Sequence, residues 1–167
     1  IKGAKSVEDQ GYVSKRKAVD CNNELEWEEG NSVVFHKRSR KPYTGTCVSY
    51  YDNKQLERSI NFVLGRENGE CFTYYKNGQV KIKSVYVEGV EDGTWGYYME
   101  NGNKEVFVLY SKGREWMVLD FDRFGVAKNN DDIKKFDDML KNKADLEASE
   151  TKRGKRKLKR EKRKEQK

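Results

Sequence analysis

Residues 68–105 read NGECFTYYKNGQVKIKSVYVEGVEDGTWGYYMENGNKE and contain nearly the same pattern twice. In each copy a Gly precedes a short aromatic stretch, which is followed by Asn-Gly, an alternating run and another Gly. Asn-Gly between alternating runs is the strongest short-range signal for a β-hairpin. We therefore interpret each copy as one hairpin.

A third, less perfect copy lies upstream, and equivalent positions recur every 24 residues in all three. A fixed period of this length indicates a repeat architecture. Residues 33–36 predict a short strand before the first copy, and residues 114–125 read as a worn fourth copy. The predicted fold is mainly β, an antiparallel meander of repeated hairpins. The recurring columns are Gly45/Gly69/Gly93, Cys47/Cys71/Trp95, Tyr50/Tyr74/Tyr98, Asn53/Asn77/Asn101 and Gly65/Gly89/Gly113.

The turns within the hairpins are predicted from their Asn-Gly pairs. Asn77-Gly78 and Asn101-Gly102 favour two-residue type I′ turns, in which both central residues have positive φ. The first copy has Asn53-Lys54 instead, which predicts a longer or strained turn. Residues 65–69 and 89–93 predict slightly longer reversals between hairpins. In the second hairpin this scheme pairs Tyr75 with Val80, Thr73 with Ile82 and Cys71 with Ser84.

The chain divides into four predicted segments. Residues 1–20 are polar with little periodicity, so we expect them to be loosely ordered. Residues 21–127 form the repeat domain. Residues 128–150 predict an amphipathic helix, from about residue 131 to 148, with Asn130 or Asp131 as N-cap. Residues 151–167 form a basic tail, either a solvated helix or disordered.

The basic charge of the chain is concentrated in this tail. Residues 152–167 contain eleven Lys or Arg and two Glu, whereas the other 151 residues carry 24 basic and 26 acidic side chains. The tail predicts contact with a polyanion, either nucleic acid, an anionic membrane surface or an acidic protein; the alternative is a solubilising role without a specific partner. Because no aromatic residue interleaves the charges, base stacking is not indicated. The candidate polyanion-binding residues are Lys152, Arg153, Lys155, Arg156, Lys157, Lys159, Arg160, Lys162, Arg163 and Lys164.

The aromatic columns are the other candidate site. One interpretation is a ladder on one face of the sheet that stacks on a partner; the alternative is cross-strand packing between hairpins. The candidate interaction surface consists of Tyr50, Phe72, Tyr74, Tyr98 and Phe107.

Catalytic and metal chemistry have little support in the sequence. His36 is the only imidazole, and the three Cys have no short paired spacing, so neither a catalytic triad nor a zinc site is predicted. Cys47 and Cys71 read as small core residues, and one disulfide stays open. We predict no enzyme activity, no cofactor and no small-molecule substrate.

The compartment is suggested only indirectly. No apolar run is long enough to span a membrane as a helix. The chain starts at Ile1, so we expect that an upstream segment was removed. We favour export to the periplasm or cell envelope, with the cytoplasm as the alternative.

The stretches GECFTYYKNGQVKIKSVYVEG and GTWGYYMENGNKEVFVLYSKG resemble the MORN-repeat variant found in many bacterial proteins. KPYTGTCVSYYDN, residues 41–53, resembles the entry into a first repeat; Cys47 and Cys71 depart from the favoured Trp, and Lys54 from the favoured Gly. The resemblance covers about residues 33–113. It implies an elongated sheet of hairpins without a catalytic centre, and such proteins are often labelled antitoxin components.

These observations together predict a non-enzymatic interaction or scaffold protein that is part of a complex. Its sheet would contact another protein, and its basic tail would tether it to an anionic partner. Two alternatives stay open: a nucleic-acid-associated protein that acts through the tail, and an antitoxin that sequesters a cognate toxin.

Overall fold

The structure is a computed structural model that describes residues 18–28 and 32–165. The segment expected to be loosely ordered, residues 1–20, therefore lies mostly outside the described residues. In chain order the elements are β1 (Val19–Asp20), α1 (Cys21–Glu24), β2 (Leu25–Trp27), β3 (Val34–His36), β4 (Lys41–Pro42), β5 (Gly45–Tyr50), β6 (Leu56–Val63), β7 (Arg66–Glu67), β8 (Gly69–Tyr74), β9 (Val80–Val87), β10 (Val90–Glu91), β11 (Gly93–Tyr98), β12 (Lys104–Ser111), β13 (Arg114–Asp120) and α2 (Asn130–Glu165).

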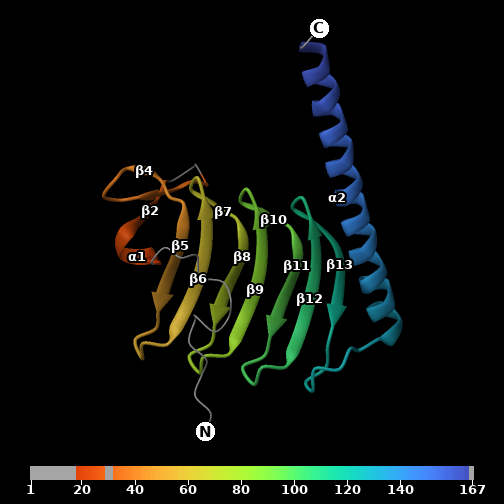
Figure 1. Cartoon of the computed structure of the whole chain (residues 1–167). Coiled ribbons are helices and arrows are strands. Elements are labelled where there is room, and N and C mark those ends of the chain that lie inside the picture. The colour runs from red at the N-terminus through yellow and green to blue at the C-terminus, as the bar shows by residue number, and fades with distance from the viewer. Residues whose placement is uncertain (1–17, 29–31, 166–167) are drawn as a thin grey trace. The chain divides into compact units, whose positions relative to one another are not determined.

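The predicted fold class is confirmed: the structure is mainly β, with many antiparallel hairpin strands and a C-terminal helix. Among the described residues one ten-stranded sheet follows the order β1-β5-β6-β8-β9-β11-β12-β13, with β7 beside β6 and β10 beside β9. Figure 1 shows these strands side by side in a single layer. Two features were not predicted. β1 pairs with β5 in parallel, and β2, β3 and β4 form a separate small sheet.

The Asn-Gly turns lie at the lower edge of the sheet in Figure 1 and differ from the prediction. Gly78 has a φ of 85°, but Asn77 keeps a negative φ, so this is not a type I′ turn. Instead Gly78 N donates to Tyr75 O, and Tyr75 N donates to Gln79 O, which closes a three-residue loop. The extra residue forces a bulge between Thr73 and Tyr74.

The bulge corrects the predicted register at one position. Tyr74 pairs with Val80, so the predicted pairing of Tyr75 with Val80 is wrong. The pairs Thr73–Ile82 and Cys71–Ser84, which lie beyond the bulge, are confirmed.

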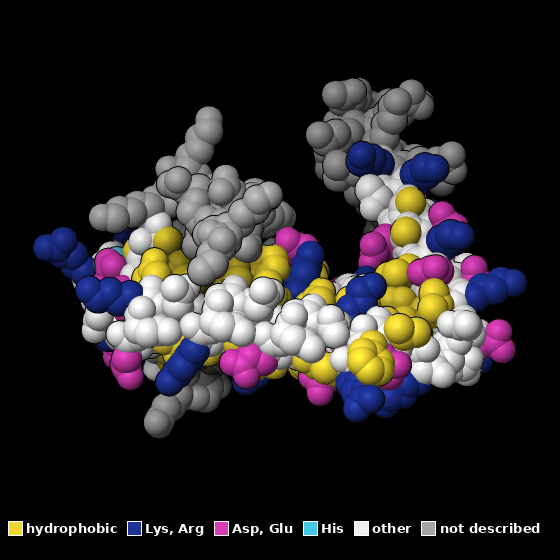
Figure 2. All heavy atoms as spheres, turned by 90° about the horizontal axis from the view of Figure 1, so that it is seen from below, with side chains coloured by type: hydrophobic (Ala, Val, Ile, Leu, Met, Phe, Trp, Pro, Cys, Tyr) yellow, Lys and Arg dark blue, Asp and Glu magenta, His cyan; other side chains and the backbone are white. Residues whose placement is uncertain are grey.

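The other hairpins close at their lower ends in the same way. Lys54 N donates to Tyr51 O and Gly102 N to Met99 O. Lys54 has a φ of 64°, so the first turn is strained, as expected, but it is not longer than the others. Figure 2, seen from below, shows the lower turns as a row of mostly uncharged polar groups with hydrophobic side chains on both sides.

The type I′ turns are at the upper edge, between hairpins. Both central residues have positive φ in the three upper turns, Leu64-Gly65, Glu88-Gly89 and Lys112-Gly113. The reversals predicted at residues 65–69 and 89–93 are therefore tighter and begin one residue earlier. Neighbouring upper turns are bonded together, because Gly89 N donates to Glu67 O and Gly113 N to Glu91 O.

Side chains at the lower edge connect successive hairpins. Asn53 Nδ2 donates to Lys76 O at 3.1 Å, and Asn77 Nδ2 donates to Glu100 O at 2.8 Å. The Asn columns of the sequence thus mark hydrogen bonds between repeats. In the last interval Asn103 replaces Asn101 in this role, since Asn103 Nδ2 donates to Arg123 O.

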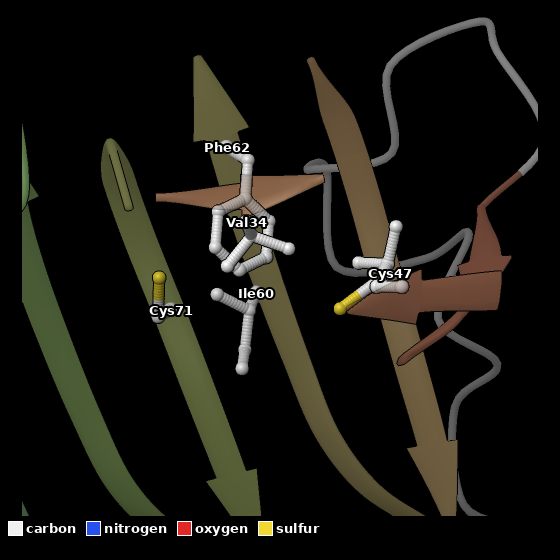
Figure 3. Close-up of a cluster of buried hydrophobic side chains, with 6 residues drawn as sticks. Val34, Cys47, Ile60, Phe62 and Cys71 are labelled. Atoms are coloured by element: carbon white, nitrogen blue, oxygen red, sulfur yellow. The ribbon is translucent and has the colours of Figure 1, made fainter. Parts of the chain in front are cut away.

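The buried core lies under the small sheet (Figure 3). Leu25 and Val34 of the small sheet pack with Ile60, Phe62 and Cys71 of the large sheet, and Cys47 completes this cluster. We call the face of the large sheet that carries Cys47, Ile60, Phe62 and Cys71 the first face, and the other the second face. Alternate residues along a strand point to opposite faces, so Val63 lies on the second face.

Helix α2 belongs to a separate unit, residues 129–167. Its start agrees with the prediction, although the capping residue is Asn129, whose Oδ1 accepts from Asp131 N at 3.0 Å. The helix continues through Gly154 to Glu165, well beyond the predicted end near residue 148. Lys, Arg, Glu and Leu are good helix formers, and one Gly costs only about 1 kcal/mol.

Candidate interaction surfaces

Four aliphatic side chains are exposed around the first two upper turns. Val63 is 46% exposed, Leu64 71%, Val87 50% and Val90 42%. Val87 and Val90 are direct cross-strand partners, so both lie on the second face with Val63. We call these four residues the aliphatic cluster. Contiguous exposed apolar residues of this kind mark interaction sites, particularly on a surface otherwise rich in charge.

Leu64 is the least expected residue of the cluster. Its φ of 50° is a left-handed conformation that costs a residue with a Cβ about 1–2 kcal/mol. Its side chain also gains little from burial. The equivalent positions are polar, Glu88 with a φ of 54° and Lys112 with a φ of 51°. Neither backbone preference nor packing therefore explains a leucine at this position.

Charges of opposite sign flank the upper turns on the two faces. Arg66 pairs with Val63, and Arg114 with Ser111, which places both arginines on the second face. Glu67 pairs with Phe62 and Glu91 with Tyr86, so these acids lie on the first face. Burial raises the pKa of Glu67, and Arg58 lowers it while Glu91 raises it further.

The predicted aromatic ladder is not uniform. Tyr50 is 56% exposed, Tyr74 is buried at 5%, and Tyr98 is half-buried. Phe72 stacks on Tyr74, with ring centroids 6.2 Å apart, and Phe107 packs edge-on against Tyr98 at 5.7 Å. The structure thus brings these residues together as two pairs, with Tyr50 apart from both.

The second tyrosine of the pairs Tyr50-Tyr51 and Tyr74-Tyr75 has a clear structural role. Tyr51 Oη donates to Tyr74 O at 2.7 Å, and Tyr75 Oη donates to Tyr98 O at 2.8 Å. These bonds join neighbouring hairpins.

An aromatic row on the first face was missed by the sequence analysis. The ring centroids of Tyr86 and Trp95, and those of Trp95 and Tyr110, are each 5.1 Å apart. Trp95 Nε1 donates to Val85 O at 3.0 Å. Burial raises the pKa of Tyr86, and the nearby Glu67 adds to this effect. In the column Cys47/Cys71/Trp95, the two cysteines lie in the core under the small sheet, and the third position, outside that core, is occupied by Trp95. The change from Cys to Trp in this column is the sequence signal that could have indicated the aromatic row.

The predicted polyanion-binding residues all lie within α2. Lys152, Arg153 and Lys155 have exposed side chains. Ten cations occur between residues 152 and 164. At about 1.5 Å rise per residue this is roughly one cation every 2 Å, close to one phosphate charge every 1.7 Å or so along duplex DNA.

Two of the three cysteines form a disulfide, and the third is a free thiol. Cys21 and Cys47 form a disulfide, with Cα atoms 5.1 Å apart, which ties α1 to β5. Cys71 is a buried free thiol, and burial raises its pKa to about 11. The interpretation of Cys71 as a core residue is confirmed; Cys47 is also in the core but is cross-linked.

The remaining candidates concern catalysis, metals and membranes. His36 Nδ1 accepts a long hydrogen bond from Ser39 N, and its Nε2 lies 3.9 Å from a Glu24 carboxylate oxygen. Within the described ranges, no group of three or more His, Cys, Asp or Glu could hold a metal ion. In the same part of the chain, no helix is sufficiently long and apolar to cross a membrane.

In comparisons with known proteins, the chain matches no protein-family model, no curated protein and no solved structure.

Proposed function

We propose that this protein is a non-enzymatic interaction module that binds another protein through the aliphatic cluster of its upper turns. The observation that carries the proposal is Leu64, an exposed aliphatic side chain held in a left-handed conformation. A residue that costs backbone energy and gains little burial is best explained by a contact made outside the chain. The resemblance to MORN-repeat variants supports the same class of function.

The basic part of α2 serves as a tether to an anionic partner in this proposal. Its cations are concentrated in the last turns of the helix, whereas residues 130–150 carry seven acids and four lysines. Attraction between such a segment and a polyanion is long-range and does not depend on sequence. The sheet then supplies specificity and the helix supplies attachment.

A nucleic-acid-associated protein is the second candidate function. The similar charge spacing of residues 152–164 and duplex DNA favours it. The Cys21–Cys47 disulfide favours the first candidate, because disulfides persist mainly in oxidising compartments and thus support export. An antitoxin role rests on the family resemblance alone.

The proposed function is tested with Leu64→Asn in the full chain. Asn tolerates the left-handed conformation better than Leu, so this variant should unfold at the same or a higher denaturant concentration. Tagged wild-type and variant proteins are recovered from the producing cells, and the bound proteins are quantified by mass spectrometry. We expect one or more partners to be depleted with Leu64→Asn.

Glu88→Asn is the matched control, since Glu88 has the same turn position and backbone conformation. It should retain the partners that Leu64→Asn loses. Equal recovery of every bound protein by wild type and Leu64→Asn would contradict the proposal.

A further inference from the structure

The aliphatic cluster is bordered by two arginines on the second face. Positions 24 residues apart occupy equivalent places in neighbouring turns, and here Arg66, Val90 and Arg114 form one such column. All three belong to the second face, because their cross-strand partners Val63, Val87 and Ser111 do. The valine in the centre thus has an arginine on the turn before it and another on the turn after it.

The three turns are in contact, so the column is continuous. A Cβ atom at Gly89 would lie 3.7 Å from Cβ of Arg66, and one at Gly113 would lie 3.1 Å from Cγ1 of Val90. Successive hairpins are two strands apart, which corresponds to about 10 Å. The two arginines are therefore about 20 Å apart, with Val87 and Val90 between them and Val63 on the β6 side of Arg66.

Both arginine side chains are available for a partner. Arg66 and Arg114 are exposed, and neither forms an ion pair with another residue in the described part of the chain. The nearest acids along the strands, Glu67 and Glu115, follow them directly and point to the first face. Glu88 at the tip of the second turn is the acid that interrupts this border.

We infer that the partner of the aliphatic cluster is a protein segment with aliphatic side chains flanked by acidic residues. The inference rests on the proposed function and adds the chemistry of the partner. Aliphatic side chains about 10 Å apart would cover the Val63–Leu64 and Val87–Val90 pairs. Carboxylates beside them would meet Arg66 and Arg114, where guanidinium groups bind carboxylates in a two-pronged geometry. A basic partner would be repelled at the same border.

The test uses the full chain and three synthetic peptides of equal length. The first has two Leu flanked by Asp; in the second Lys replaces Asp, and in the third Ser replaces Leu. Binding is measured by fluorescence anisotropy. The basic part of α2 also attracts acidic peptides, so the signal of the cluster is the difference between wild type and Leu64→Asn.

We expect the Leu–Asp peptide to bind wild type about tenfold more tightly than it binds Leu64→Asn, since burial of one leucine is worth about that factor or more. Arg66→Glu/Arg114→Glu should lose a similar factor for the Leu–Asp peptide and gain affinity for the Leu–Lys peptide. Glu91→Gln, on the opposite face of the same hairpin, should change neither affinity.

The inference fails if wild type and Leu64→Asn bind the Leu–Asp peptide equally, or if the Leu–Lys peptide binds the cluster better. It also fails if sedimentation shows that wild type self-associates through Leu64 without any peptide preference, because the occupant is then a second copy. If Leu64→Asn loses its cellular partner but the peptides do not discriminate, the proposed function stands and only the chemistry of the partner is wrong. If neither effect is seen, both fail.

Discussion

Tyr75 Oη donates a hydrogen bond of 2.8 Å to the carbonyl oxygen of Tyr98, in the next hairpin along the chain. Tyr51 makes the same bond to Tyr74 O. In the pairs Tyr50-Tyr51 and Tyr74-Tyr75 the second tyrosine therefore connects neighbouring repeats, and no external ligand is needed to account for its presence.

Replacement of Tyr75 by Phe should lower the free energy of unfolding by about 1 kcal/mol, because the carbonyl of Tyr98 loses its donor. Urea unfolding followed by circular dichroism measures this change. Tyr50→Phe is the control: Tyr50 is exposed, and a change of similar size there would contradict the assignment.

Lys54→Gly should stabilise the protein by about 1 kcal/mol. Lys54 occupies the place that Gly78 and Gly102 occupy in the next two turns, and its φ of 64° strains a residue with a Cβ. Thermal unfolding of this variant measures the gain. Gly78→Lys introduces the same strain in the second turn and should lower stability by a similar amount; an increase would overturn the turn assignment.

Loss of the disulfide should lower the free energy of unfolding by about 3 kcal/mol, because Cys21 and Cys47 are 26 residues apart and close a loop of that length. Cys21→Ala/Cys47→Ala is compared with wild type in urea. A reductant should destabilise wild type but leave the variant unchanged. Equal stability of the two proteins without reductant would show that the bridge is absent.

Alkaline pH should destabilise the fold through Cys71. Its folded pKa of about 11 lies above the ordinary value of 9.0, since burial disfavours the thiolate. Folding therefore favours the protonated thiol, and this contribution is complete below pH 9 and lost as pH rises towards 11. We expect Cys71 to account for a loss of about 2 kcal/mol over this interval.

Urea unfolding of wild type and Cys71→Ala across the same pH range measures the contribution of the Cys71 thiol to the free energy of unfolding. The free energy of the variant should fall less steeply, although its tyrosines still titrate. Parallel curves for the two proteins would exclude a contribution from the thiol.

Removal of residues 151–167 should abolish binding to duplex DNA and to anionic vesicles while the β-sheet spectrum is retained. For DNA, each phosphate that the protein neutralises contributes roughly −0.9 to the slope of log affinity against log salt. Lys152→Gln/Arg153→Gln/Lys155→Gln should therefore reduce the magnitude of that slope by at most about 3. DNA binding that survives the truncation would assign it to the sheet.

The period of the repeat was predictable, but the distribution of turn types was not. Asn77-Gly78 has the composition of a type I′ turn, yet the lower turns contain three residues, because Asn77 keeps a negative φ while its Oδ1 accepts from Gln79 N. The type I′ turns instead use Leu64, Glu88 and Lys112, residues without any local preference for positive φ. Each of these turns is hydrogen-bonded to the segment before it, since Gly65 N donates to Tyr43 O, Gly89 N to Glu67 O and Gly113 N to Glu91 O. A single hairpin taken alone contains no sign of these bonds.

The candidate interaction surfaces were likewise only partly predictable from the sequence. The basic residues of α2 were recognisable from composition, whereas the aliphatic cluster depends on which residues of different hairpins come to share one face. Val63 and Val87 are 24 residues apart and read as ordinary strand residues. They are recognised as part of an exposed surface only once Leu64 is placed at the tip of the turn beside them.

The hydrogen bonds of Asn53 and Asn77 to the next hairpin have a consequence for how this chain can evolve. The first and second hairpins each join their successor through an equivalent Asn side chain and an equivalent carbonyl, Lys76 O and Glu100 O. An in-frame duplication of 24 codons would therefore insert a hairpin that already has the donors and acceptors it needs on both sides. The sheet can change its length in steps of one unit while the segments that precede and follow the repeats in the chain keep their sequences.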